Sequence, residues 1–102
     1  MITWTPRILS GTSLRGYLTG SFPEMLVKLR LMSGQTGETD CGDGKVTVEF
    51  IGTLNGQPFT VYDYYGEKEP LHIGGSTKLD LEILKVALAD VGVVSDMGER
   101  WR

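Results

Sequence analysis

Residues 71–77 read Leu-His-Ile-Gly-Gly-Ser-Thr, and an apolar-periodic run from Leu79 to Val91 follows them directly. The alternation in residues 71–73 predicts a short strand with His72 on the face opposite to its two aliphatic neighbours. The glycine pair predicts a turn, and Thr77 predicts the start of a helix that extends to about Asp90. The apolar residues of this helix recur at helical spacing: Leu79, Ile83, Val86, Ala87 and Val91, with Leu84 and Leu88 beside them.

Two further strands are predicted immediately upstream. Residues 45–51 alternate apolar and polar side chains, which is typical of a half-buried strand. Asn55-Gly56 is a strong signal for a two-residue hairpin turn. Residues 59–65 then return antiparallel, with Phe59 and Val61 facing the core. Together with residues 71–73, these segments predict an antiparallel meander.

The first third of the chain predicts one helix and one short strand. Ser21 and Glu24 have the spacing of a capping box, and Pro23 suits the first helical turn. We expect this helix to cover residues 23–32 and to end at Ser33-Gly34. Residues 14–18 predict the strand. The apolar face of the helix contains Phe22, Met25, Leu26, Leu29 and Met32.

These elements predict an α+β fold in two layers, with a three- to four-stranded antiparallel β-meander covered on one face by two helices. The length of 102 residues suits a single domain, 1–102, with an ordered core at about 13–91. We expect residues 1–12 to be irregular and anchored by Trp4, and residues 92–102 to form a tail.

The composition limits the functional classes. A net charge of −3 with scattered Lys and Arg makes direct binding to nucleic acid unfavourable. The sequence contains no apolar run of membrane-spanning length and no signal-peptide pattern. Its single cysteine, Cys41, cannot form an internal disulfide, which fits a reducing compartment. We therefore expect a soluble cytoplasmic protein without a membrane partner.

The turn at Gly74, Gly75, Ser76 and Thr77 is the first candidate site. Glycines before a helix N-terminus can expose several backbone N–H groups, and the helix dipole favours an anion such as phosphate there. The same residues also make an ordinary strand-to-helix turn with a Ser or Thr cap. The spacing matches neither a P-loop nor a dinucleotide-binding fingerprint.

Aromatic residues are the second candidate site. Tyr62 and Tyr64 are expected on the sheet face that points away from the helices, and Tyr17 is a further member of the group. Such rings can stack on a base or anchor a partner, although tyrosines are also good strand formers. His72 is expected on that outer face. It can serve as a ligand contact or simply as a strand residue.

Metal binding and catalysis find little support. Glu38, Asp40 and Asp43 lack the spacing of a calcium loop, and His72 is the only histidine. Two aspartates close to Cys41 disfavour a reactive thiolate. The sequence contains no recognisable catalytic set, so we expect neither an enzyme nor a cofactor.

The order of the motifs resembles small accessory proteins of bacteriophages. The resemblance is carried by residues 16–18, Lys45-Val46, residues 61–64, residues 72–75 and the closing helix. It covers roughly residues 13–90, and its motifs are short. The resemblance implies an anti-defence role. Some such proteins sequester nucleotide-derived signals inside homo-oligomers, and others block a defence nuclease as anti-CRISPR proteins do.

These observations lead to two functional hypotheses. In the first, a homo-oligomer sequesters a small phosphate-containing ligand without catalysis, using the eight residues Tyr17, Tyr62, Tyr64, His72, Gly74, Gly75, Ser76 and Thr77. In this hypothesis, basic residues such as Arg15, Lys45 and Lys68 hold the phosphate. In the second, the acidic protein docks on a host defence protein by charge mimicry. The last helix is apolar around more than half of its circumference, so Leu84 or Leu88 is expected in a subunit contact.

Overall fold

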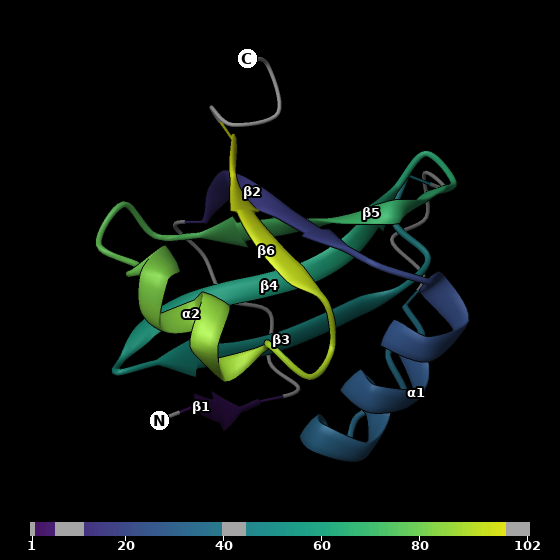
Figure 1. Cartoon of the computed structure of the whole chain (residues 1–102), viewed down its shortest axis with the longest axis horizontal. Helices are drawn as coiled ribbons and strands as arrows, with labels where there is room; N and C mark the ends of the chain where they lie inside the picture. The colour runs from purple at the N-terminus through teal and green to yellow at the C-terminus, as the bar shows by residue number, and fades with distance from the viewer. Residues whose placement is uncertain (1, 6–11, 40–44, 98–102) are drawn as a thin grey trace.

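The computed structural model describes residues 2–5, 12–39 and 45–97 (Figure 1). Its elements follow the order β1 (Ile2–Trp4), β2 (Ser13–Thr19), α1 (Phe22–Ser33), β3 (Glu49–Leu54), β4 (Gln57–Tyr64), β5 (Glu67–Gly75), α2 (Leu81–Ala87) and β6 (Val93–Asp96). This is an α+β fold, as the sequence predicted. None of the helices in the described part of the chain is long and apolar enough to cross a membrane.

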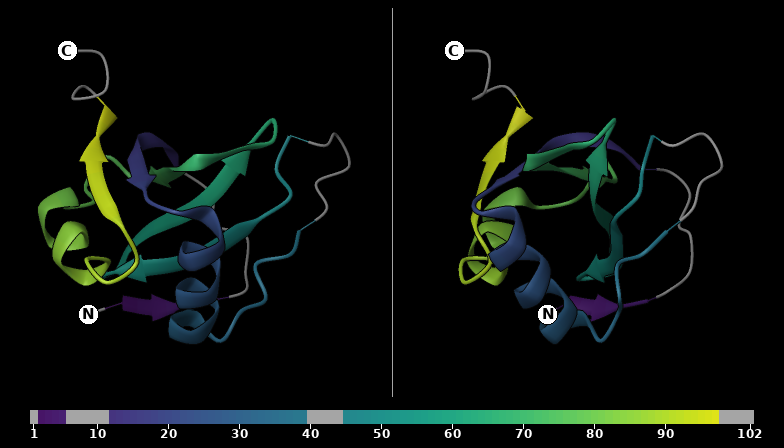
Figure 2. Two further views of the ribbon diagram at one scale, coloured as in Figure 1. Left: turned by 45° about the vertical axis from the view of Figure 1, so that its right-hand side comes forward. Right: turned by 90° about the vertical axis from the view of Figure 1, so that its right-hand side faces the viewer.

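All strands belong to one antiparallel sheet with the order β1-β3-β4-β5-β2-β6. The expected meander is present as β3-β4-β5. Strand β2 pairs with the edge of β5 that faces away from β4. The prediction of three to four strands was too low, because β1 and β6 extend the sheet at its two ends. Residues 2–4 are therefore not irregular, and residues 93–96 are not part of a tail. Figure 2 shows that the sheet curves around the helices.

The hairpin between β3 and β4 turns at the predicted place. Asn55 and Gly56 both have positive φ, at 51° and 82°, which is the conformation of a two-residue turn with the twist of the flanking strands. The register that follows pairs Phe50 with Val61 and Glu49 with Tyr62. Alternate residues of β3 and β4 therefore point into the core, and the residues between them point to the outer face.

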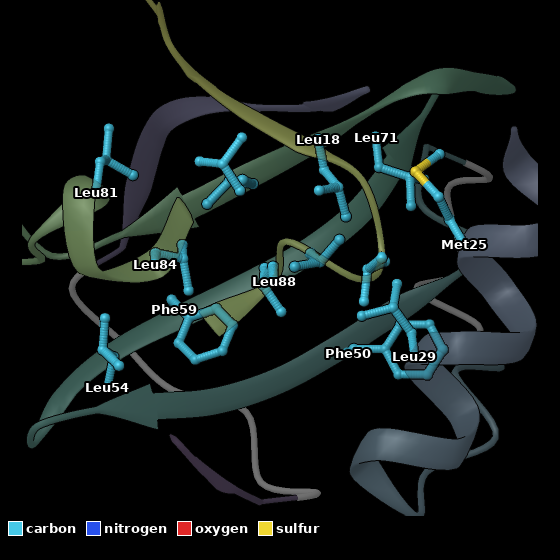
Figure 3. Close-up of a cluster of buried hydrophobic side chains, with 14 of the residues drawn as sticks. Leu18, Met25, Leu29, Phe50, Leu54, Phe59, Leu71, Leu81, Leu84 and Leu88 are labelled. Atoms are coloured by element: carbon cyan, nitrogen blue, oxygen red, sulfur yellow. The ribbon is translucent and has the colours of Figure 1, made fainter. Parts of the chain in front are cut away.

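Both helices cover the same face of the sheet, as predicted, and they enclose one hydrophobic core (Figure 3). From α1, Met25 and Leu29 are fully buried in this core. From α2 and the turn after it, Leu84 and Leu88 are also fully buried. The sheet contributes the remaining large members: Leu18, Phe50, Leu54, Phe59, Val61, Leu71, Ile73 and Val94.

This packing overturns the expected role of the last helix. Leu84 and Leu88 have no exposed surface in the single chain, so neither can form a subunit contact without unpacking the core. Val86, which we expected in the core, is 72 % exposed. The helix is also shorter than predicted. Because α2 has only seven residues, a single side of it faces the sheet, and its leucines pack there against the core of the same chain.

Candidate functional site

Four of the predicted site residues come together on the outer face of the sheet. His72 of β5 lies between Tyr62 of β4 and Tyr17 of β2 in the strand register. Its ring centroid is 5.2 Å from that of Tyr17, 5.5 Å from that of Tyr62 and 5.5 Å from that of Tyr64. The expectation that these side chains share the face away from the helices is therefore met. The prediction that they hold a ligand is not tested by this arrangement.

The imidazole of His72 fills the centre of this aromatic cluster. The side chain of His72 is only 14 % exposed, and Tyr17 is 5 % exposed. Glu67 lies near the same ring, with Oε1 3.7 Å from Nε2 of His72. Burial and, after it, the charge of Glu49 and the neighbouring tyrosines raise the pKa of Tyr62. The rings of this cluster thus stabilise the sheet as side-chain pairs between neighbouring strands. The ring of Tyr64 is the most exposed of them.

The turn at residues 74–77 does not form the expected anion site. Gly74 and Gly75 belong to β5, because β4 and β2 pair with them on both sides. The helix starts four residues later than expected, with Asp80 as its N-cap. The Oδ1 atom of Asp80 already accepts hydrogen bonds from the N–H groups of Glu82 and Ile83, so a carboxylate of the chain itself occupies the helix start.

The four turn residues also point in different directions. A Cβ on Gly74 would lie 3.4 Å from the ring of Tyr62, which places Gly74 beside the aromatic cluster. Gly75 faces the core against Leu79. The hydroxyl of Ser76 donates to Oε1 of Gln57 at 2.8 Å, and Thr77 is exposed. They are therefore not one binding loop.

The three basic residues proposed to hold phosphate have separate partners. Arg15 donates from Nη1 to the carbonyl of Ser76. Lys45 lies over the ring of Tyr65, with Nζ 5.9 Å from the centroid. Lys68 forms an ion pair with Asp63. These contacts place the three side chains on different parts of the surface and do not create a common cationic pocket.

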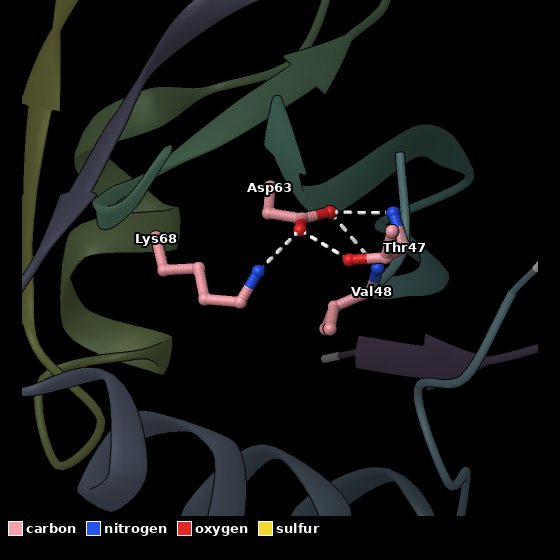
Figure 4. Close-up of polar contacts among 4 residues, drawn as sticks. All are labelled: Thr47, Val48, Asp63 and Lys68. Atoms are coloured by element: carbon pink, nitrogen blue, oxygen red, sulfur yellow. Dashed lines mark hydrogen bonds and ion pairs between the residues drawn. The ribbon is translucent and has the colours of Figure 1, made fainter. Parts of the chain in front are cut away.

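Asp63 is a fully buried carboxylate that the sequence did not reveal (Figure 4). Its Oδ1 accepts from the N–H groups of Thr47 and Val48 at 2.7 and 2.9 Å. Its Oδ2 accepts from the hydroxyl of Thr47 at 2.5 Å and from Nζ of Lys68 at 2.9 Å. Burial alone would raise the pKa of Asp63, but these hydrogen bonds outweigh it and lower the pKa to about 2. The carboxylate thereby fixes the chain just before β3.

The connection between α1 and β3 borders two adjoining hollows of the surface. A cavity of about 510 Å³ is lined by residues 33–39, by Trp4 of β1 and by Glu49 and Ile51 of β3. A second hollow of about 400 Å³ shares four of these loop residues and adds Arg30 of α1. We call the two together the β3-edge groove. Its volume lies in the range of small-molecule sites.

Residues 35–39 form the wall of this groove, and hydrogen bonds that resemble those between paired strands hold them against β3. Gln35 acts as a substitute for a strand residue, because Nε2 donates to the carbonyl of Ile51 at 2.9 Å and Oε1 accepts from its N–H at 3.1 Å. The N–H of Glu49 donates to the carbonyl of Gly37 at 2.7 Å. Residues 35–39, which read as a polar surface loop, therefore cover the edge of the sheet beside β1.

Gly37 allows residues 35–39 to pack closely against Phe50 of β3. Its φ of 80° lies in the left-handed region, and a Cβ would approach the ring of Phe50 to 2.4 Å. The wall is also tied to α1, because Nε of Arg30 donates to the carbonyl of Thr36 at 2.7 Å. Arg30 is thus positioned at the end of the groove that is remote from Trp4.

Glu49 is the chemically distinctive residue of the groove. Burial raises the pKa of its carboxyl group. Glu49 is among the residues that line the cavity, but the alternation of β3 directs its side chain to the outer face beside Tyr62, whereas Trp4 packs against Phe59 on the core side. In the described part of the chain, every buried side-chain nitrogen or oxygen has a hydrogen-bond partner, so the carboxylate oxygens of Glu49 are either hydrogen-bonded or accessible to water.

Other types of site find little support in the described residues. In residues 2–5, 12–39 and 45–97, no group of three His, Cys, Asp or Glu side chains is placed to hold a metal ion. Asp40, Cys41 and Asp43 lie outside the described residues. Comparison with protein-family models, with curated proteins and with solved structures finds no match to this chain.

Proposed function

We propose that this chain is a non-catalytic binding protein that holds a small nucleotide in the β3-edge groove. The observation that carries this proposal is the groove itself, whose larger part is lined by Trp4 and Glu49 and whose adjoining hollow is lined by Arg30. The proposal keeps the ligand class expected from the sequence but moves it away from the turn at residues 74–77.

A nucleotide suits this groove because the two ends of the groove differ in charge. Glu49 and Trp4 line only the larger cavity, and Arg30 lines only the adjoining hollow. An aromatic base can lie against an indole. A guanidinium group is well matched to a phosphate. The phosphate is placed on the Arg30 side because Arg30 supplies the positive charge there; Glu38 lines both parts and does not distinguish them.

Binding without chemistry is the simplest use of such a groove. His72 lies in the aromatic cluster, and the described lining of the groove contains hydroxyl groups from Ser33, Thr36 and Thr39 but no histidine. A protein that retains a nucleotide in this way can sequester a signal, which is the role implied by the phage resemblance. We keep that role, and the homo-oligomer it involves, as part of the proposal.

Isothermal titration calorimetry with a panel of nucleoside monophosphates, cyclic dinucleotides and ADP-ribose tests the proposal. We expect at least one member to bind, and we expect Arg30→Gln to weaken its binding. Lys28→Gln is the matched control, because Lys28 is an exposed basic residue on the same helix that does not line the groove. Absence of binding to every member at millimolar concentration would refute the proposal.

A second candidate function is docking on a partner protein, and one observation favours it. Tyr64 and Tyr65 form an exposed edge-to-face pair at the β4–β5 turn, with ring centroids 4.5 Å apart. Exposed tyrosines often anchor protein interfaces. In a pull-down from host lysate, Tyr65→Ser should release a partner if docking is the function. Retention of the partner by this variant would argue against this surface.

A further inference from the structure

We propose that two copies of this chain associate through the outward side of α1, with the two helices antiparallel and Val27 of each copy at the two-fold axis. The surface concerned is an exposed apolar pair, Val27 and Leu31, which we call the α1 outer stripe. The inference gives a surface to the homo-oligomer of the proposed function. It does not depend on nucleotide binding, because the β3-edge groove is formed within one chain.

Helix α1 is apolar on two sides. Met25 and Leu29 have no exposed surface and hold one side of the helix in the core, whereas Val27 is 55 % exposed and Leu31 is 80 % exposed. Figure 1 shows the helix at the margin of the molecule, with its other side turned away from the sheet. Val27 and Leu31 are four residues apart, so their side chains are neighbours on this outer side. Single exposed aliphatic residues are ordinary, but a neighbouring pair on one helix favours a contact with another surface.

The charges beside the stripe favour a second copy as the occupant. Glu24 and Lys28 are both exposed, and they are four residues apart along one flank of the stripe. In an antiparallel pair with a two-fold axis, this flank of one helix faces the same flank of the other. With Val27 at the axis, Glu24 of one copy and Lys28 of the other differ by about 3 Å in height, at 1.5 Å per residue. The pairing therefore brings opposite charges together twice.

The same register gives Leu31 an apolar partner. Leu31 of one copy lies at the level of the exposed Pro23 of the other, beside the Val27 side chain. The contact thus has the two Val27 side chains at its centre and a leucine at each end. A single pair of short helices is at the low end of interface sizes, so we expect a weak dimer that forms as the concentration rises.

Sedimentation equilibrium at micromolar to millimolar concentrations tests the association. We expect a monomer–dimer equilibrium, and we expect Leu31→Ser to weaken it at least about tenfold because each dimer then loses the burial of two leucine side chains. Val86→Ser is the matched control, since Val86 is an aliphatic residue of α2 that is 72 % exposed, and this variant should associate as the native protein does. A native protein that stays monomeric would overturn the proposal and leave the stripe to a different protein. A dimer unaffected by Leu31→Ser would also overturn it.

Charge reversal tests the antiparallel arrangement itself. Glu24→Lys alone places two lysines together at each flank contact, and Lys28→Glu alone places two glutamates there, so each variant should associate more weakly than the native protein at low ionic strength. A mixture of the two variants restores opposite charges at both contacts and should associate more tightly than either variant alone. A folding defect cannot produce this gain. A mixture that associates no better than its components would refute the arrangement.

Calorimetry with the nucleotide panel separates this inference from the proposed function. Leu31 does not line the groove, so Leu31→Ser should bind a nucleotide as the native protein does. A monomeric native protein that binds a nucleotide would refute the dimer and leave the proposed function standing. A dimer with the expected response to Leu31→Ser that binds no member of the panel would refute the proposed function and support the dimer.

Discussion

Asn in place of Asp63 tests how a buried carboxylate stabilises this fold. In the native state the carboxylate accepts four hydrogen bonds, including one from the ammonium group of Lys68. The folded-state pKa of about 2 lies below the ordinary pKa of 3.8 for an aspartate side chain. At about 1.4 kcal/mol per unit, this difference corresponds to about 2–3 kcal/mol of stabilisation when Asp63 is ionised.

The sign of the pH dependence follows from the lowered pKa. The stabilisation is fully present above the unfolded-state pKa of about 3.8 and disappears as the pH falls toward the folded-state pKa of about 2. Asp63→Asn removes the charge at every pH and leaves Lys68 without its partner. We expect the variant to lose about 2–3 kcal/mol of unfolding free energy at pH 7 and much less at pH 2.

Urea denaturation followed by circular dichroism at pH 7, 4 and 2 measures both quantities. Asp90→Asn serves as the control, because Asp90 is an exposed aspartate. The variant and the native protein should approach each other in stability as the pH falls. A constant difference between them across this pH range would refute the account of Asp63 as an ionised, hydrogen-bonded anchor.

Three further substitutions test other parts of the structure. Gln35→Ala removes two hydrogen bonds to the edge of β3 and should cost about 1–3 kcal/mol, with faster amide exchange at Ile51 measured by NMR. Leu84→Ala should cost about 2–5 kcal/mol in urea denaturation, whereas Val86→Ala should change stability by less than about 0.5 kcal/mol; equal effects would contradict the orientation of α2. Gly16→Ala places a Cβ 2.2 Å from a carbonyl oxygen of β6, so the amides of residues 93–96 should lose protection from exchange, and unchanged protection would disprove that contact.

Local sequence signals predicted the elements whose contacts are local. The Asn55-Gly56 turn, the two strands that flank it and the first helix follow from alternation, helical spacing and turn chemistry within short windows. The helix ends at Gly34 as predicted, although the hydroxyl of Ser21 makes no capping hydrogen bond. Here a non-helical backbone at residue 21 and Pro23 in the first turn were sufficient to start the helix.

The elements that were missed depend on distant partners. β1 and β6 have three and four residues, and each exists because it pairs with β3 or β2, far away in the sequence. Gly74 and Gly75 read as a turn, but pairing on both sides extends β5 through them. Tertiary pairing thus overrode the local preference of glycine.

In the candidate site, too, the features set by local sequence were predicted and those set by distant contacts were not. Strand alternation predicted that Tyr62, Tyr64 and His72 share the outer face. The groove could not be predicted, because it depends on residues 33–39 lying along β3 and on Gln35 substituting for a strand there. No signal in the sequence singled out Glu49, because a carboxylate at an outward position of an alternating strand is ordinary.

The most direct test of the central claim is a ¹H–¹⁵N NMR titration of the protein with the nucleotides of the calorimetry panel. With a member that binds, we expect saturable chemical-shift changes at the amides of residues 33–39 and of Trp4, Glu49 and Ile51, the residues that line the larger part of the β3-edge groove. The amides of Tyr64 and Thr77 should stay unchanged. A spectrum without changes, or changes centred on the aromatic cluster instead, would contradict the assignment of this groove as the binding site.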